Sequence, residues 1–271
     1  MRRRSVHPQA AAAAKPDGLS RVDSLQRGLQ VLRCFHQGEN DVSLGELAAR
    51  LGLSRATTLR LLETLGAHGF VLRVPGTDRF GLHVACLVVG QAVLSGSGLV
   101  RAARPMLQEF SRRSGAHSAL FVHEGEDLVV IASAQAQGGG PAWLGAGIRA
   151  PVAATAVGRA WIWSQGPQVQ GEWVARLRSG AVDAPSRAAP AALYRAFQEL
   201  EECGACRSGS DSAGATVFAA PARLPDGGVA VLGAVRALPP GGPPTDGEAP
   251  LLQAIAELAR DLPGVVALAR S

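Results

Sequence analysis

The chain has 271 residues, and its 27 Lys and Arg against 22 Asp and Glu give a formal net charge of +5. Hydrophobic residues make up 47% of the chain, a share that can build cores, which excludes a wholly disordered protein. No apolar run approaches the roughly 18 residues that a membrane-spanning helix needs, which argues against a membrane protein.

Residues 1–20 are predicted to form a disordered arm. The segment begins with three arginines after Met1 and contains a run of five alanines, which superficially resembles a signal peptide. The apolar run is too short for that purpose, and His7-Pro-Gln interrupts the approach to it. We therefore expect no leader, and the predicted location is cytoplasmic.

Two amphipathic helices are predicted after this arm. Apolar side chains at spacings of three and four indicate a first helix over residues 24–37, stopped near Gly38. The sequence Ser43-Leu-Gly-Glu46 is a capping box, which opens a second helix. Gly52 ends this second helix.

A third helix follows directly and completes a helix-turn-helix unit. Ser54 caps this helix, which runs from Arg55 to about Ala67. Two short helices separated by three residues, with a cap on each, are typical of a helix-turn-helix. The predicted inner face of the third helix consists of Ala56, Leu59, Leu62 and Leu65.

Two short strands are predicted next, over residues 70–74 and 79–82. The residues between them, Pro75-Gly-Thr-Asp78, have the composition of a turn. A helix, a helix-turn-helix and then a hairpin occur in the order that a winged helix requires.

The remainder of the chain alternates helices and hairpins. Two helices are predicted over 84–95 and 98–114, broken at Ser95-Gly-Ser-Gly98. We expect these two helices to form the linker between the domains. The later pattern, with hairpins dominant, predicts an α+β fold with an antiparallel sheet. Its predicted strands cover 118–123, 127–133, 216–222 and 228–236, and its helices 155–164, 191–202 and 248–262.

The predicted organisation therefore has four parts. They are a disordered arm (1–20), a winged helix-turn-helix DNA-binding domain (21–83), a helical linker (84–114) and an effector-binding or oligomerisation domain (115–271).

The predicted third helix carries the candidate DNA contacts. The second helix of a helix-turn-helix enters the major groove, where arginine can donate two bonds to guanine and threonine can contact a base. The candidates on it are Ser54, Arg55, Thr57, Thr58 and Arg60. Arg73 and Arg79 flank the hairpin tip, within reach of the DNA backbone or minor groove. The alternative is that Arg55 and Arg60 only solvate an exposed helix face, or that the unit contacts protein.

The charge distribution favours the DNA interpretation. Residues 1–115 hold 16 Lys and Arg against 8 Asp and Glu, whereas residues 116–271 hold 11 against 14. An asymmetry of +8 against −3 predicts a polyanionic partner for the first half. A random surface imbalance is the alternative.

Three segments of the helix-turn-helix resemble the DNA-binding domain of IclR-type bacterial transcriptional regulators. They are Ser24-Leu-Gln-Arg-Gly-Leu-Gln-Val-Leu, Ser43-Leu-Gly-Glu-Leu-Ala and Ser54-Arg-Ala-Thr-Thr-Leu-Arg-Leu-Leu-Glu-Thr-Leu. Arg79-Phe-Gly-Leu82 is similar to the end of that family's wing. The segment 151–160, Pro-Val-Ala-Ala-Thr-Ala-Val-Gly-Arg-Ala, resembles its effector-domain signature, and 218–221 with 227–230 resemble its closing strand pair.

The resemblance implies a GAF-like effector domain, a homodimer or homotetramer, and control by a small-molecule effector. It places Thr155 and Ala156 in the effector pocket, with Asp211 and Ser212 as the polar partners. A dimer would present two recognition helices to double-stranded DNA with a near-palindromic operator, one helical turn (~34 Å) or a multiple apart. Ala153 stands where histidine is common and Arg159 where lysine is usual, so a degenerate pocket that serves only oligomerisation is the alternative.

An enzyme is the more distant interpretation. Gly145-Ala-Gly147 matches a loose dinucleotide pattern, but only Trp143-Leu precedes it where a strand is required, and no ribose-binding acid follows. His117 and His123 have no array of catalytic partners. The pair Cys203 and Cys206 has metal or redox spacing without a second ligand pair. We therefore predict no enzyme activity, no cofactor and no metal.

Overall fold

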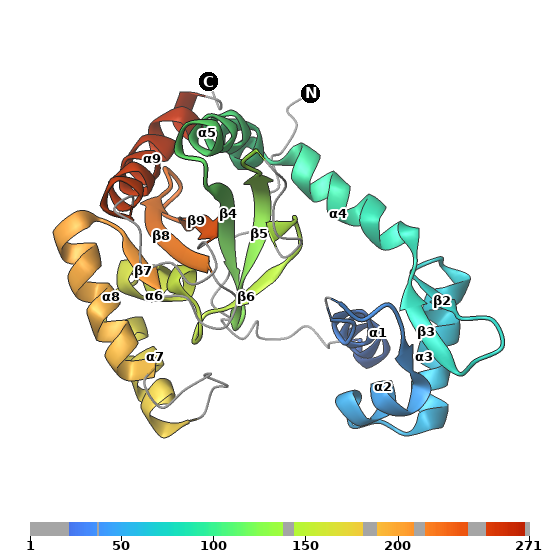
Figure 1. The fold of residues 1–271 in the computed structure, drawn as a ribbon. Helices are drawn as coiled ribbons and strands as arrows, with labels where there is room; N and C mark the ends of the chain where they lie inside the picture. The colour runs from blue at the N-terminus through green and yellow to red at the C-terminus, as the bar shows by residue number, and fades with distance from the viewer. Residues whose placement is uncertain are drawn as a thin grey trace. The chain divides into compact units, whose positions relative to one another are not determined.

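A computed structural model describes residues 22–36, 38–137, 144–180, 189–208, 215–237 and 248–268. These residues divide into two compact units, with the division along the chain between residues 95 and 96, and each unit is described by itself (Figure 1). The predicted arm lies outside the described residues.

The N-terminal unit is a winged helix. Its elements are α1 (Asp23–Arg33), β1 (Val42–Ser43), α2 (Leu44–Leu51), α3 (Arg55–Ala67), β2 (Val71–Arg73), β3 (Arg79–Leu82) and α4 (Val84–Gly96). The three strands form an antiparallel sheet in the order β1-β3-β2. The core is formed by the buried side chains of Val31, Val42, Leu47, Leu62, Val71 and Phe80.

The helix caps predicted from sequence fix the start of α2 and α3. Ser43 accepts a hydrogen bond from the Glu46 backbone N–H at 3.2 Å, and the Glu46 carboxylate accepts one from the Ser43 N–H at 2.9 Å. Gly52 ends α2 with φ +62°, a conformation that glycine adopts without strain. Ser54 caps α3 by accepting from the Thr57 N–H. The chain can therefore turn within three residues between the two helices.

The C-terminal unit has an antiparallel sheet with helices on both faces. The sheet order is β6-β5-β4-β9-β8-β7. Helices α5 and α9 pack together against one face, and α6, α7 and α8 lie on the other (Figure 1). The strands are β4 (His117–Glu124), β5 (Asp127–Ala134), β6 (Arg149–Pro151), β7 (Cys206–Ser208), β8 (Ala215–Arg223) and β9 (Val229–Ala237). The helices are α5 (Gly98–Ser114), α6 (Ala156–Ser164), α7 (Pro167–Ser179), α8 (Ala189–Cys203) and α9 (Glu248–Leu268).

The predicted fold class is confirmed, an α+β protein with an N-terminal winged helix and a GAF-like C-terminal domain. The two helices of the predicted linker differ from each other. Helix α4 has no buried residue, whereas α5 buries seven residues and belongs to the C-terminal unit. Sequence reasoning also missed α7 and the short strands β1, β6 and β7.

Candidate functional site

The N-terminal turn of α3 presents the candidate DNA contacts. The hydroxyl groups of Ser54 and Thr57 are hydrogen-bonded to each other at 2.9 Å. The Ser54 hydroxyl oxygen also accepts a hydrogen bond from the Thr57 backbone N–H at 3.2 Å. Arg55 and Arg60 are exposed. The Arg60 guanidinium has no hydrogen bond or ion pair to any described residue. The first two turns of α3, with the cap residue, therefore offer two hydroxyls and two guanidinium groups.

Two assignments on α3 were wrong. Thr58, predicted as a DNA contact, is fully buried, and its hydroxyl donates to the Ser54 carbonyl oxygen at 3.0 Å. A side chain held in that way supports the helix start and cannot reach a base. Ala56, predicted on the inner face, is exposed. The register differs because the buried stripe of α3 passes through Thr58 and Leu62, four residues apart.

Arg55 reaches the wing. Its Nη2 lies 3.6 Å from an oxygen of Asp78, with both side chains more than half exposed. Arg73 is held within the wing turn, where its Nε donates to the Thr77 carbonyl oxygen at 3.0 Å, and its guanidinium lies 5.9 Å from the centre of the Phe80 ring. The side chains of Arg55 and Arg73 therefore both contact the turn between β2 and β3.

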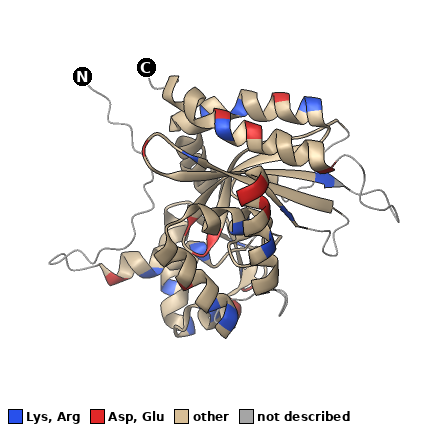
Figure 2. Ribbon diagram, turned by 90° about the vertical axis from the view of Figure 1, so that its left-hand side faces the viewer, with Lys and Arg blue, Asp and Glu red and all other residues tan. Residues whose placement is uncertain are grey.

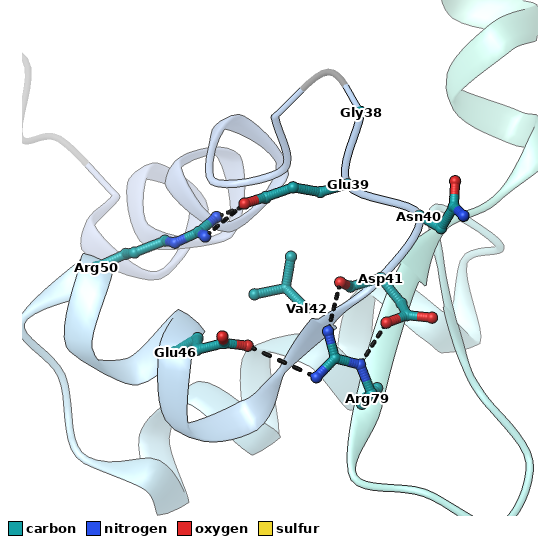
Figure 3. A pocket seen from close by; sticks show the side chains of 8 residues that line it. All are labelled: Gly38, Glu39, Asn40, Asp41, Val42, Glu46, Arg50 and Arg79. Atoms are coloured by element: carbon teal, nitrogen blue, oxygen red, sulfur yellow. Dashed lines mark hydrogen bonds and ion pairs between the residues drawn. The ribbon is translucent and has the colours of Figure 1, made fainter.

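Arg79 is anchored inside the N-terminal unit. Its Nε pairs with the Asp41 carboxylate, its Nη2 donates to the Asp41 carbonyl oxygen at 2.9 Å, and its Nη1 lies 3.9 Å from Glu46 (Figure 3). The hydrogen bond to Asp41 raises the pKa of Arg79. Arg79 thus joins β3 to the segment before β1 and to α2.

A cavity of about 340 Å³ lies beside this anchor (Figure 3). On its other side, Arg50 forms two hydrogen bonds with Glu39, at 2.7 and 2.8 Å. These bonds lower the pKa of Glu39 to about 2. Sequence reasoning missed this pair because eleven residues separate its members and no local pattern links them. The cavity is lined by Gly38, Glu39, Asn40, Asp41, Val42, Glu46, Arg50 and Arg79.

The basic excess of the first half does not lie on the winged helix itself. Residues 22–95 hold seven arginines and six carboxylates, a net charge of +1. The first 21 residues, of which none is described, contribute +4, and residues 96–115 contribute +3. Acidic and basic residues occur in both units (Figure 2). Net charge alone therefore does not mark the winged helix as a DNA-binding surface, and the positions of its individual arginines carry the hypothesis.

The predicted effector residues are only partly described. Thr155 caps α6, with its hydroxyl donating to the Pro151 carbonyl oxygen at 2.8 Å and accepting the Gly158 N–H at 3.1 Å. Ala156 is buried. Asp211 and Ser212 lie outside the described residues. The structure therefore brings together only Thr155 and Ala156, at the start of one buried helix.

An aromatic cluster that the sequence did not indicate joins α6 to β4 and α7. The His123 ring stacks on Trp161 at 3.8 Å between ring centres, and Trp161 meets Trp173 edge to face at 6.3 Å. Arg176 lies 4.4 Å over the Trp173 ring and pairs with Glu126 at 2.5 Å. The pKa of His123 is lowered because the ring is partly buried. His123 thus packs on Trp161 at the edge of the hydrophobic core of the C-terminal unit.

Cys206 is fully buried, and burial raises the pKa of its thiol to about 12, while Cys203 is exposed. Within the described segments, no group of three or more His, Cys, Asp and Glu side chains is placed to hold a metal ion. No single helix in those segments is long and apolar enough to cross a membrane. Helices α4 and α5 pass that test of length and composition only as a pair interrupted at Ser97.

A capped helix-turn-helix with a wing, followed in the same chain by an α+β domain, places the protein among winged helix-turn-helix proteins with a GAF-like second domain. Residues 24–75 match the IclR helix-turn-helix domain. The N-terminal unit therefore carries an IclR helix-turn-helix domain.

Individual proteins are similar to this chain over part or most of its length. The HTH-type transcriptional regulator XynR of Escherichia coli (strain K12) is 29% identical over 144 residues, which cover 52% of this chain and 57% of that protein. The chain therefore matches only about half the length of this curated relative. An IclR family transcriptional regulator from Brucella abortus shares the fold, with a TM-score of 0.76 at 24% identity over 95% of this chain and 96% of that one. An IclR homologue from Microbacterium hydrocarbonoxydans, complexed with 4-hydroxybenzoate, has a TM-score of 0.67 at 21% identity over 90% and 99%.

Proposed function

We propose that the chain is a sequence-specific DNA-binding transcriptional regulator. The observation that carries this proposal is the N-terminal half of α3, where the side chains of Arg55 and Arg60 are exposed and the hydroxyls of Ser54 and Thr57 are hydrogen-bonded to each other. Arginine and threonine side chains at the start of a recognition helix can contact base edges in the major groove. Arg73 would add a contact to the phosphate backbone, and Arg79 would support the wing.

The partner in assembly is a second copy of the chain. Large apolar side chains are exposed on α4, where Val84, Leu87, Val88, Val89 and Val93 are each more than half exposed. Leu25 and Leu29 of α1 are exposed as well. Monomeric proteins rarely expose so many apolar side chains close together. A two-fold dimer would cover them and would place two α3 helices on a near-palindromic operator, about 34 Å or a multiple apart.

The C-terminal unit would adjust DNA binding in response to a small-molecule effector. A structural neighbour binds 4-hydroxybenzoate, and the start of α6 at Thr155 and Ala156 is the proposed pocket wall, with Asp211 and Ser212 as polar partners. An effector acts only by binding one arrangement of the protein better than another, typically by about 1–3 kcal/mol. This function requires no chemical step, and its site of action is the cytoplasm.

Selection of genomic DNA fragments by the full chain, followed by footprinting, tests the proposal. We expect enriched fragments with two related half-sites, and we expect Arg60→Ala to lose about 1–3 kcal/mol of operator affinity. Arg195→Ala, at an exposed position on α8, is the control and should bind as the unmodified chain does. Failure to enrich any sequence would contradict the proposal.

The competing interpretation is a C-terminal unit that only oligomerises. A ligand that binds only the folded state raises its melting temperature. We expect a small carboxylic acid, with 4-hydroxybenzoate as the first probe, to raise the melting temperature and to change operator affinity. A panel of such acids that leaves both unchanged supports the competing interpretation.

A further inference from the structure

Three elements of the N-terminal unit converge around the guanidinium group of Arg55. Arg55 is the first residue of α3, and its Nη2 lies 3.6 Å from Oδ2 of Asp78 in the turn between β2 and β3. Its Nη1 lies against Gly45 in the first turn of α2, only 3.1 Å from the place that a Cβ atom of residue 45 would occupy. The Arg55 guanidinium group therefore lies between the wing turn and α2, with its side chain more than half exposed.

The position of Asp78 is fixed independently of Arg55. The Leu44 N–H at the start of α2 donates to the Asp78 carbonyl oxygen at 3.0 Å. The next residue, Arg79, pairs with Ser43 in the sheet and is anchored to Asp41. The Asp78 carboxylate makes no other direct hydrogen bond or ion pair with a described residue. The Asp78 backbone is thus fixed, and its exposed carboxylate lies beside an arginine of the candidate DNA-reading turn.

We infer that Asp78 and Gly45 are specificity-determining positioning residues that act through Arg55; this inference rests on the proposed DNA-binding function. A guanidinium group presents five N–H donors on more than one edge. One edge can remain toward Asp78 while the opposite edge donates two parallel bonds to the neutral O6 and N7 acceptors of guanine. The carboxylate is therefore compatible with a base contact.

The same carboxylate opposes a contact with phosphate. Non-specific binding depends almost entirely on basic side chains that neutralise phosphates. A phosphate bound at the free edge of Arg55 would lie close to the Asp78 carboxylate and be repelled by its negative charge, whereas guanine O6 and N7 are neutral. Asp78 therefore weakens non-specific binding more than it weakens the specific complex, and this difference raises sequence discrimination.

Asp78→Asn tests the inference in the full chain, with affinities measured for the selected operator and for a scrambled duplex at one salt concentration. We expect scrambled-DNA affinity to rise about two- to five-fold, the range for an exposed ion pair, and the ratio of specific to non-specific affinity to fall accordingly. Asp23→Asn on α1 is the charge-matched control, because it removes one exposed carboxylate from the same unit. It should leave the ratio unchanged.

Two further variants separate positioning from general charge and from stability. In an Arg55→Ala background, Asp78→Asn should no longer change the ratio, since its effect runs through Arg55. Gly45→Ala should shift the guanidinium group by a few tenths of an ångström and lower the ratio slightly. It should not lower the melting temperature, because alanine favours a helix more than glycine does. A merely structural role for Gly45 would instead change the melting temperature and leave the ratio as it was.

The outcomes distinguish this inference from the function on which it rests. If the unmodified chain selects no DNA sequence, the proposed function fails and the inference fails with it. If the unmodified chain selects an operator while Asp78→Asn and Asp23→Asn change the affinity ratio equally, the inference alone is overturned. The same holds if Asp78→Asn changes the ratio as much in the Arg55→Ala background as in the unmodified chain.

Discussion

Arg50 of α2 holds Glu39 of the preceding loop by a two-bond fork, with Nη1 donating to Oε2 at 2.8 Å and Nη2 donating to Oε1 at 2.7 Å. The same Nη1 donates to the Cys34 carbonyl oxygen at 2.7 Å. One side chain of α2 therefore fixes both the end of α1 and the loop that follows it. The placement of the helix-turn-helix depends on this link between segments distant in sequence.

This fork predicts a pH dependence for the N-terminal unit. The pKa of Glu39 is lowered from 4.5 to about 2, chiefly by the hydrogen bonds from Arg50. A carboxylate with a depressed folded pKa contributes stability that is present above its unfolded pKa and is lost as the pH falls toward its folded pKa. We expect the melting temperature to fall as the pH is lowered from about 4.5 toward 2, measured by circular dichroism.

Glu39→Gln should have a melting temperature a few degrees lower at pH 6 and a shallower fall below pH 4.5. Glu63→Gln, at an exposed position on α3, is the control and should keep the slope of the unmodified chain. An equally steep fall in Glu39→Gln would show that the fork is not the source of the pH dependence.

Valine substitutions at two adjacent threonines should affect different properties: stability at Thr58 and operator affinity at Thr57. Thr58→Val removes a buried hydroxyl whose acceptor, the Ser54 carbonyl oxygen, keeps the hydrogen bond from the Thr58 N–H. We expect it to lower the free energy of unfolding by about 0.5–1.5 kcal/mol with operator affinity unchanged. Thr57→Val should weaken operator binding by about 1 kcal/mol or more. Urea titration and a DNA-binding isotherm on both variants measure this, and a reversed pattern would restore Thr58 as the base contact.

The parts of the fold predicted correctly are those that local sequence determines. The cap of Ser43 with Glu46, the turn at Gly52 and the cap at Ser54 each depend on residues within four positions, and all three have the predicted geometry. Strand β1 has two residues and β7 has three, so their sequences alone contain no periodicity. Each exists because a longer strand offers it hydrogen bonds.

The candidate site shows the same contrast between features that local sequence determines and features that depend on distant residues. The sequence located the turn that begins α3, but it could not show which of its side chains point inward, since Ala56 and Thr58 both fit a helical pattern. It could not show that Arg55 meets Asp78 or that Arg79 meets Asp41, because those pairs depend on how the wing folds back onto the helices. The basic excess could be assigned only to residues 1–115 together, and just +1 of that +8 belongs to residues 22–95.

Gly158 should tolerate no side chain. A Cβ at this position in α6 would lie 2.1 Å from the Val152 carbonyl oxygen, and a backbone atom cannot rotate away. We expect Gly158→Ala to lower the free energy of unfolding of the C-terminal unit by about 3 kcal/mol or more. Gly171→Ala is the matched control, because Gly171 is exposed within α7 with nothing within 4 Å of its added Cβ. It should raise stability by about 0.5–1 kcal/mol, and equal effects of the two would disprove the close approach.

His123 predicts a second pH dependence, in the C-terminal unit. Burial lowers its pKa below 6.5, against the opposing effects of a hydrogen bond to Gly125 and the carboxylates of Glu124, Glu126 and Asp127. The unfolded chain then binds a proton at a higher pH than the folded chain does, so stability falls as the pH drops below about 6.5. All four tryptophans lie in this unit, so their fluorescence reports its unfolding.

We expect the melting temperature of this unit to be a few degrees lower at pH 5.5 than at pH 7.5. His123→Phe should keep the stack on Trp161 and remove that part of the difference. His83→Gln, at an exposed position after the wing, should retain it. If His123→Phe keeps the full difference, another group is responsible.

The exposed apolar surface of α4 should be required for both assembly and tight DNA binding. Leu87 is 68% exposed in the single chain, so replacing it costs no core packing, whereas a charge there would be trapped in the proposed dimer. We expect Leu87→Glu to lower the molar mass measured by light scattering and to weaken binding to a two-half-site operator at least about ten-fold, because the half-sites would then be bound separately. Leu268→Glu, at an even more exposed apolar position near the end of α9, should change neither. A Leu87→Glu protein with unchanged mass and affinity would mean that assembly, and the coupling of the two recognition helices, uses another surface.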